Sequence, residues 1–199
     1  MLRLTLLGVG AMNSPRYRPA GLLATWSGHR VMLDGGGGTD PAAPLDGWLV
    51  SDEHAELVPR IRRRAKELAV HPRIDSFAAN GVRLRPLPVR HTSHRTVGYL
   101  LETTTRHAVW APEFWVFPRW ATGADLMFAD AAGWKRPIRF TGGVGGHACV
   151  EDVAAAARRA AVRRLVFAHI GRPSIAAIDQ KQRPPFGRWG VEGAVFLLR

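Results

Sequence analysis

The sequence predicts an α+β fold in a single domain spanning residues 1–199, with many short strands and few helices. Three observations support this class. Short apolar or alternating runs recur between glycine, proline and asparagine turns, and two longer stretches have the apolar spacing of amphipathic helices. The length is sufficient to bury a substantial core, and no shift in composition marks a linker.

The first part of the chain is predicted to consist of strands. Strands are expected over residues 2–7, 21–27 and 29–33, the last two separated by a Ser-Gly turn. The glycine run that follows Asp34, residues 35–38, lacks the Lys-Ser or Lys-Thr pair of a phosphate-binding loop. We therefore interpret it as a turn that needs unusual backbone angles.

A helix is predicted after the apolar run 48–50. Its apolar stripe consists of Leu57, Ile61, Ala65 and Leu68. Its basic positions, largely elsewhere on the helix, are Arg60, Arg62, Arg63, Arg64 and Lys66. Pro59 is compatible with the first turn of a helix but not with its interior. Residues 52–56 are therefore expected to lie in the loop before this helix.

The rest of the chain is predicted to alternate between strands and helices. Further strands are expected over residues 74–79, 82–89, 96–102, 107–111, 164–168 and 193–198, with a short apolar run at 125–129. Asn80-Gly81 is typical of a tight hairpin turn. Residues 150–161 are rich in alanine and are predicted to form the second helix.

Cysteine content and hydropathy exclude several classes of protein. Cys149 is the only cysteine, which excludes an internal disulfide framework and a cysteine-rich zinc module. Any metal would therefore be held by His, Asp or Glu. The apolar runs are too short to span a bilayer, and the N-terminal residues lack a signal-peptide pattern, so we expect a cytoplasmic protein without a membrane partner.

The basic charge suggests a class of ligand. The formal net charge is +12, and nearly all basic residues are arginines, whose planar fork matches phosphate oxygens. This favours a phosphate-bearing small molecule as substrate and makes nucleic acid a possible partner. A genomic bias toward arginine codons is the alternative explanation, and the sequence leaves the oligomeric state open.

The stretch 50–57 concentrates ligand-type side chains. Asp52, His54 and Glu56 alternate, so an extended chain would direct all three to one side, as in the beginning of a metal site. In the alternative interpretation this is an acidic turn that caps the following helix, with Ser51 or Asp52 as N-cap and Glu56 as a first-turn charge.

Three more ligand-type residues follow predicted strands. His91 follows 82–89, Glu113 follows 107–111, and His169 follows 164–168. Loops at one edge of a sheet can gather a site from distant parts of the sequence. We therefore expect these residues to converge with Asp52 and His54.

Several motifs resemble the metallo-β-lactamase-fold hydrolases, in the branch that contains ribonuclease Z and phosphodiesterases. In chain order they are residues 6–11 (LLGVGA), 21–23 (GLL), 31–36 (VMLDGG), 86–91 (PLPVRH), 97–100 (VGYL), 146–157 and 164–170 (RLVFAHI). Their order and spacing extend over almost the whole chain. The resemblance implies a four-layer αββα sandwich that binds metal ions.

The resemblance also implies the metal ligands. The family's first motif runs His, any, His, any, Asp, His; the matching residues here are Asp52, His54, Glu56 and Leu57, and leucine cannot bind a metal. The later ligands match His91, Glu113 as the bridging carboxylate, and His169. This set suits zinc best, with manganese or iron as alternatives, in a site of one or two ions.

Two functional classes follow from this comparison, and a third from charge alone. The first is a metal-dependent hydrolase of a phosphodiester or another ester-like substrate, which would use a metal-bound hydroxide and Glu56 and His147 as catalytic residues, with His94 as a further candidate for proton transfer. The second is a non-catalytic relative that binds a ligand, nucleic acid or protein. The third is a nucleic-acid-binding module, whose affinity would fall steeply with salt.

Overall fold

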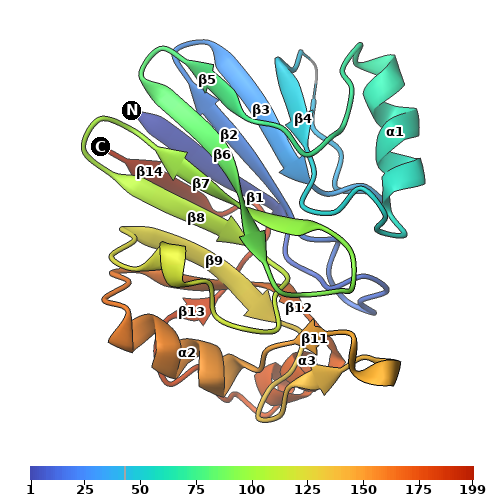
Figure 1. The fold of residues 1–199 in the computed structure, drawn as a ribbon, viewed down its shortest axis with the longest axis vertical. Helices are drawn as coiled ribbons and strands as arrows, with labels where there is room; N and C mark the ends of the chain where they lie inside the picture. The colour runs from blue at the N-terminus through green and yellow to red at the C-terminus, as the bar shows by residue number, and fades with distance from the viewer. Residues whose placement is uncertain (43) are drawn as a thin grey trace.

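The computed structural model of the chain describes residues 1–42 and 44–199, which form two β-sheets packed face to face (Figure 1). The first sheet has the strand order β14-β1-β2-β3-β4. Its strands are β1 (Leu2–Gly8), β2 (Gly21–Trp26), β3 (His29–Asp34), β4 (Gly47–Leu49) and β14 (Val195–Leu198). Because β14 pairs with β1, the two ends of the chain lie side by side.

The second sheet has the order β13-β12-β9-β8-β7-β6-β5. Its strands are β5 (Phe77–Ala79), β6 (Val82–Val89), β7 (Thr96–Glu102), β8 (His107–Ala111), β9 (Leu126–Ala131), β12 (Leu165–Ile170) and β13 (Arg188–Trp189). A short separate ribbon joins β10 (Ile138–Arg139) to β11 (Gly146–His147), with the 3₁₀ turn η2 (Thr141–Gly143) between them. A second 3₁₀ turn, η1, covers Arg119–Ala121.

Helices cover the outer face of each sheet. Helix α1 (Val58–Glu67) packs Ile61 and Ala65 against Met32 and Trp48 of the first sheet. Helices α2 (Val150–Arg159) and α3 (Arg172–Asp179) lie on the far side of the second sheet (Figure 1). The layers are therefore helix, sheet, sheet and helix, which confirms the predicted four-layer α+β sandwich.

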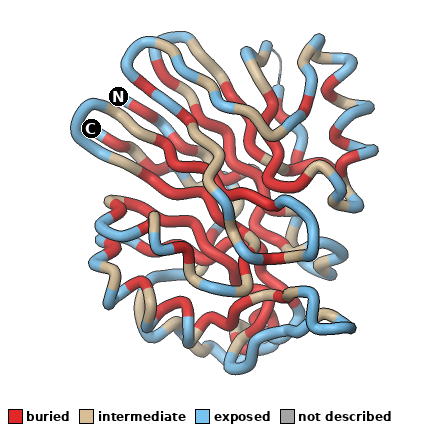
Figure 2. Tube along the Cα trace, viewed as in Figure 1, coloured by how far each residue is buried: buried red, intermediate tan, exposed pale blue. Residues whose placement is uncertain are grey.

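The core between the sheets follows from the side-chain pattern of the strands. In β1, Leu2, Leu4 and Leu6 are fully buried while Arg3 is exposed, as expected for a strand with one buried face. β9 and β12 are buried along their whole length because both of their faces are covered, which explains their nearly continuous apolar sequences. Figure 2 shows this buried centre inside an exposed surface of loops and helices.

The strand directions place one edge of the second sheet next to the predicted site. β8, β9 and β12 are mutually parallel, and β6 has the same direction as β8 because each is antiparallel to β7. The C-terminal ends of these four strands therefore meet at one edge. This arrangement explains why residues after β6 and β8 come close to residues near the end of β12.

Several predicted boundaries were wrong. The strand expected at 74–79 begins only at Phe77, the last strand begins at Val195, and the second helix ends at Arg159. α3 was not predicted, because it is only eight residues long and Pro173 lies in its first turn. None of the helices in residues 1–42 and 44–199 is long and apolar enough to cross a membrane.

Candidate functional site

A cavity of about 650 Å³ lies between the strand ends of the second sheet and the turn that precedes α1. The six residues predicted as metal ligands all line it: Asp52, His54, Glu56, His91, Glu113 and His169. His94 and His147 line it too. The fold thus brings residues more than a hundred positions apart in sequence to one cavity, but it holds them in two different ways.

One side of the cavity, here called the sheet wall, consists of His91, Glu113, His147 and His169, together with the fully buried Asp130 behind them. Glu113 lies at its centre: Oε2 is 3.0 Å from Nε2 of His91, and Oε1 is 3.0 Å from Nε2 of His169. Both imidazoles are buried, whereas the Glu113 side chain remains 27% exposed toward the cavity. A single carboxylate therefore joins a histidine in the loop after β6 to a histidine in β12.

Asp130 is the member of the sheet wall that the sequence analysis did not assign to the site. It lies in β9, is fully buried, and accepts hydrogen bonds from the backbone amides of Phe114 (3.1 Å) and Ala132 (2.8 Å). Its Oδ2 also lies 2.8 Å from Nδ1 of His147. A charge inside the otherwise apolar run 126–131 was the available signal, because such a residue is rarely buried without partners.

The position of His169 depends on an irregularity in its strand. We predicted that it follows the strand, but β12 continues to Ile170 and includes it. Its φ of 60° is in the left-handed region, and the pairing with β9 shifts register between Phe167 and Ile170. A bulge of this kind redirects a side chain. The imidazole therefore points toward Glu113 instead of continuing the alternation of the strand.

The close packing of charges shifts the pKa values of the sheet wall. Burial alone would raise the pKa of Glu113, but the neighbouring His169 and His91 hold it well below its usual value. Burial would lower the pKa of His169, but Glu113 and Asp130 raise it to about 10, and the pKa of His91 is also raised by Glu113. The pKa of Asp130 falls to about 2, because His147 and His169 outweigh the effect of burial.

The other side, here called the turn wall, comprises residues 52–57. Asp52 is buried; its Oδ1 accepts the backbone amide of His54 (2.7 Å), and its Oδ2 lies 2.8 Å from Nε2 of His94. His54 and Glu56 are exposed, and the rings of His54 and His94 lie 5.0 Å apart. Asp52 therefore contacts His94, a histidine outside the predicted ligand set.

The local structure of the turn wall contradicts two expectations. Residues 53–57 form turns, so Asp52, His54 and Glu56 do not lie on one side of an extended chain. The capping interpretation was also wrong, because α1 begins after Leu57 and, in the described structure, no side chain caps it. The interpretation of Pro59 was right: it lies in the first helical turn.

Asp34 connects the two sheets beneath the site. It has a φ of 52°, and its carboxylate accepts the Ser51 amide (2.6 Å) and the indole N–H of Trp110 (2.7 Å). Ser51 directly precedes the turn wall, and Trp110 lies in β8, which leads to Glu113. Burial raises the pKa of Asp34 to about 6, although both hydrogen bonds act in the opposite direction. Asp34 thus fixes the spacing of the two walls.

The donor set of the sheet wall fits a divalent metal ion. The Nδ1 of His91 donates to the carbonyl of Gly146 (2.9 Å), which leaves Nε2 directed at Glu113, as is usual for a metal-binding histidine. The Nδ1 of His169 is buried without a hydrogen-bond partner in the described chain. Asp130, His147 and His169 are the group of three ligand-type residues, within the described part, that is compact enough to hold one ion.

Two sheets packed between two helical layers, with the C-terminal ends of four strands at the site, have the architecture of the metallo-β-lactamase fold. Residues 39–170 match the model of the beta-lactamase superfamily domain, and the chain belongs to this family. No curated protein matches it by sequence.

Solved structures with little sequence similarity share the fold. The metallo-β-lactamase fold protein YhfI from Bacillus subtilis has a TM-score of 0.76 at 13% identity, with 99% of this chain and 100% of that chain covered. A diphosphatase from the PhnP family has a TM-score of 0.72 at 16% identity, with 98% of this chain and 96% of that chain covered. Zn(2+)-bound PqqB from Methylobacterium extorquens has a TM-score of 0.70 at 14% identity, with 98% of this chain and 100% of that chain covered.

Proposed function

We propose that this protein is a metal-dependent hydrolase that cleaves a phosphodiester or another ester-like substrate. The observation that carries this proposal is the Glu113 carboxylate, which lies between Nε2 of His91 and Nε2 of His169 at the wall of a large cavity. Structural similarity to a PhnP-family diphosphatase supports a phosphate-bearing substrate, and the net charge of +12 is compatible with one.

The sheet wall contains the residues that would hold the metal. His91, Glu113 and His169 face the cavity and would hold the ion there. Of the compact group, Asp130 lies behind two of the histidines and its Oδ2 is already engaged by His147. Imidazole and carboxylate donors together suit zinc, with manganese and iron as alternatives. When bound, such an ion supplies Lewis acidity and lowers the pKa of a coordinated water.

The turn wall is poorly suited to a second ion. Leu57 lines the cavity where the family's first motif ends in histidine, and its side chain offers no donor atom. Asp52 already contacts the amide of His54 and the ring of His94. A site with one ion is therefore favoured, and Asp52, His54 and Glu56 remain candidate ligands only if this turn rearranges.

His147 is positioned to transfer a proton. Its Nδ1 donates to Oδ2 of Asp130 (2.8 Å), since a carboxylate can only accept, and this leaves Nε2 available on the cavity side. Asp130 is itself fixed by two backbone amides, so it holds the imidazole in one orientation. Nε2 of His147 could then accept a proton from the attacking water and pass it to the leaving group. This geometry supports His147 more strongly than the exposed Glu56 as the catalytic residue.

The lining of the cavity also indicates the chemical character of the substrate beyond its scissile ester. Apolar side chains make up much of its lining: Met12, Leu57, Ile138, Phe140 and Pro173. Met12 and Ile138 are more than a third exposed, so apolar surface is available to a ligand in this cavity. Exposed Arg172 also lines the cavity and could attract an anionic substrate. An organic phosphodiester with an apolar group fits this combination.

The proposal is tested by metal analysis and by activity. Protein purified without chelator should contain about one divalent ion per chain and should hydrolyse bis(p-nitrophenyl) phosphate or a lactone. Chelation should abolish the activity, and zinc, manganese or iron should restore it. The non-catalytic alternative predicts instead no stoichiometric metal, no hydrolysis of a phosphodiester, lactone or thioester, and ligand binding that tolerates chelator. Location in the cytoplasm and a single domain over residues 1–199 stay predictions.

A further inference from the structure

A second pocket, of about 300 Å³, adjoins the cavity. His91 and Thr92 line both spaces. The short strand β10 separates them, because Ile138 lines the cavity whereas Arg139, the next residue, lines the second pocket. We call this space the arginine pocket; it is lined by Val89, Arg90, His91, Thr92, Trp115, Arg139, Gly143, Val144 and Gly145.

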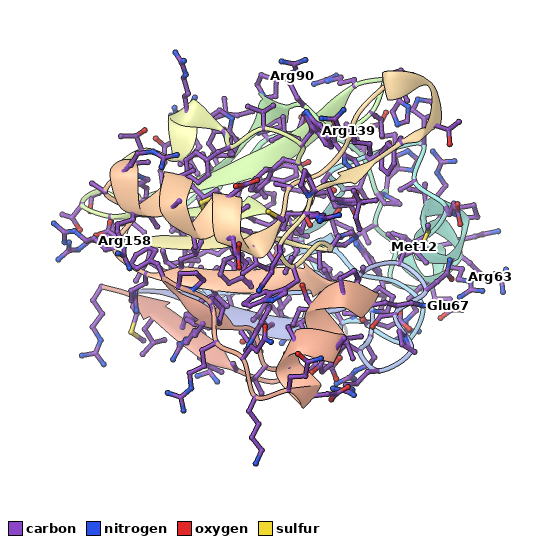
Figure 3. All side chains as sticks on the ribbon, turned by 90° about the horizontal axis from the view of Figure 1, so that it is seen from below. Met12, Arg63, Glu67, Arg90, Arg139 and Arg158 are labelled. Carbon is purple, nitrogen blue, oxygen red and sulfur yellow. The ribbon has the colours of Figure 1, made fainter. Side chains whose placement is uncertain are left out.

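The arginine pocket concentrates positive charge without a compensating acid. Arg90 and Arg139, both exposed and both labelled in Figure 3, come from segments about fifty positions apart in sequence. Within residues 1–42 and 44–199 neither arginine pairs with a carboxylate, and none of the lining residues is acidic. Other arginines of this chain do pair with acids, such as Arg85 with Glu102 and Arg106 with Asp125.

The aromatic ring of Trp115 holds one of the two arginines in place. The guanidinium of Arg139 lies 5.6 Å from the ring centroid of Trp115, a distance typical of a cation–π contact. When the flat face of a guanidinium stacks on an aromatic ring, the N–H groups along the edge of the guanidinium remain available to bind an anion. The Arg139 side chain is therefore partly ordered before a ligand binds, which reduces the conformational entropy lost on binding.

The backbone fixes the position of Trp115. Its amide donates to the carbonyl of Arg90 at 2.5 Å, which joins the ends of β6 and β8. A Cβ at Gly146 would lie 2.4 Å from the Trp115 ring, and one at Gly145 would lie 1.9 Å from the carbonyl oxygen of His91. Only glycine fits at both positions, so the β10–β11 ribbon packs directly against the indole and the His91 backbone.

We infer that the arginine pocket binds a second phosphate group of the substrate, while the scissile ester lies beside Glu113 and His147 in the cavity. This inference rests on the proposed function and narrows it to substrates with at least two anionic groups. Two arginine forks on converging segments match the oxygens of a phosphate better than those of a single carboxylate. The shared residues His91 and Thr92 make a continuous surface along which one ligand can reach both spaces.

A kinetic comparison tests the pocket with two substrates that differ by one phosphate. The p-nitrophenyl ester of thymidine 5′-phosphate has one phosphodiester, and its 3′-phosphorylated form adds the second anionic group. Wild-type protein should show a KM about tenfold or more lower for the phosphorylated form. Arg139→Gln and Arg90→Gln should each remove most of this preference while leaving kcat for the simpler ester within about twofold.

A matched control excludes a general effect of charge. Arg62→Gln removes an exposed arginine from α1 that lines neither space, so it should keep the full preference. Arg139→Lys retains the charge but loses the fork and should give an intermediate KM. Equal KM values for the two substrates in the wild type, or an equal loss in Arg62→Gln and Arg139→Gln, would overturn the inference.

A binding measurement separates this inference from the hydrolase proposal. Inorganic pyrophosphate is titrated calorimetrically into chelator-treated protein, a readout that needs neither metal nor turnover. Binding about tenfold weaker in Arg139→Gln than in Arg62→Gln supports the pocket even if no ester is hydrolysed, and then only the hydrolase proposal fails. Pyrophosphate affinity that is the same in both variants contradicts the pocket even if hydrolysis is observed.

Discussion

The sheet wall and the turn wall face the same cavity, but they hold their side chains in different ways. In the sheet wall, Glu113 joins His91 to His169 and Asp130 orients His147, so contacts between segments fix each group. In the turn wall, His54 and Glu56 are exposed, and Asp52 contacts the adjacent amide of His54 and the exposed ring of His94 from another segment. Buried contacts therefore hold the side chains of the sheet wall, whereas two of the three candidate ligands of the turn wall, His54 and Glu56, are exposed.

The largest difference between the walls should be in activity when one carboxylate is neutralised on each side. Glu113→Gln removes the charge between two imidazoles and should lower kcat/KM by at least about 100-fold, together with the metal content. Glu56→Gln alters an exposed side chain and should lower kcat/KM less than about tenfold. Phosphodiesterase rates and metal-to-protein ratios of both variants check this. A larger loss in Glu56→Gln would reverse the roles of the two walls.

The next comparison is between His147 of the sheet wall and His94, which contacts Asp52 of the turn wall. His147→Gln removes the imidazole that Asp130 orients and should lower kcat by about 100-fold. His94→Gln, at a position whose side chain is 39% exposed, should lower kcat less than about tenfold. Comparable losses in the two variants would show that proton transfer does not depend on the Asp130–His147 pair.

Stability should distinguish the two aspartates. Asp130→Asn places an amide against two backbone N–H groups in a fully buried position and should cost about 3 kcal/mol. Asp52→Asn weakens contacts at the edge of a turn and should cost about 1 kcal/mol. Urea unfolding of both variants in chelator measures these costs. Equal costs would mean that the turn wall is as firmly held as the sheet wall.

The last comparison is a dependence of stability on pH that is specific to the sheet wall. The pKa of His169 is raised to about 10 in the folded, metal-free protein, so its stabilising contribution is complete below about pH 6.5 and disappears as the pH rises through 10. The difference in unfolding free energy between wild type and His169→Gln should therefore shrink across this range. A difference in unfolding free energy that grows with pH would contradict the predicted direction of this pH dependence. His94→Gln, at the histidine that contacts Asp52 of the turn wall, serves as the control.

Most of the secondary structure could be predicted, because local patterns determine it. The alternation of β1, the Asn80-Gly81 hairpin and the stripe of Ile61 and Ala65 each depend on neighbouring residues. Boundaries failed where tertiary contacts decided them, as at Phe77 and at the end of β12. α3 was missed because its proline and short length obscure the helical period.

The site could be predicted only in part, for a similar reason. The strand-end positions of His91 and Glu113 were visible in the sequence, and the parallel strand directions explain their convergence. The contribution of Asp130 was not visible, because its partners are the amides of Phe114 and Ala132 and the ring of His147. The alternation of Asp52, His54 and Glu56 suggested a common side, but turns rather than a strand follow Asp52.

The sequence by itself determined the α+β class, most strands, α1 and α2, and the ligand-type residues that line the cavity. These features depend on side-chain periodicity, turn chemistry and residue type, which are properties of short segments. Only the tertiary structure decided that Glu113 lies between His91 and His169, that Asp130 orients His147, and that Arg90 and Arg139 share a pocket. Each of these contacts joins segments distant in sequence, and their distances follow from sheet register and packing.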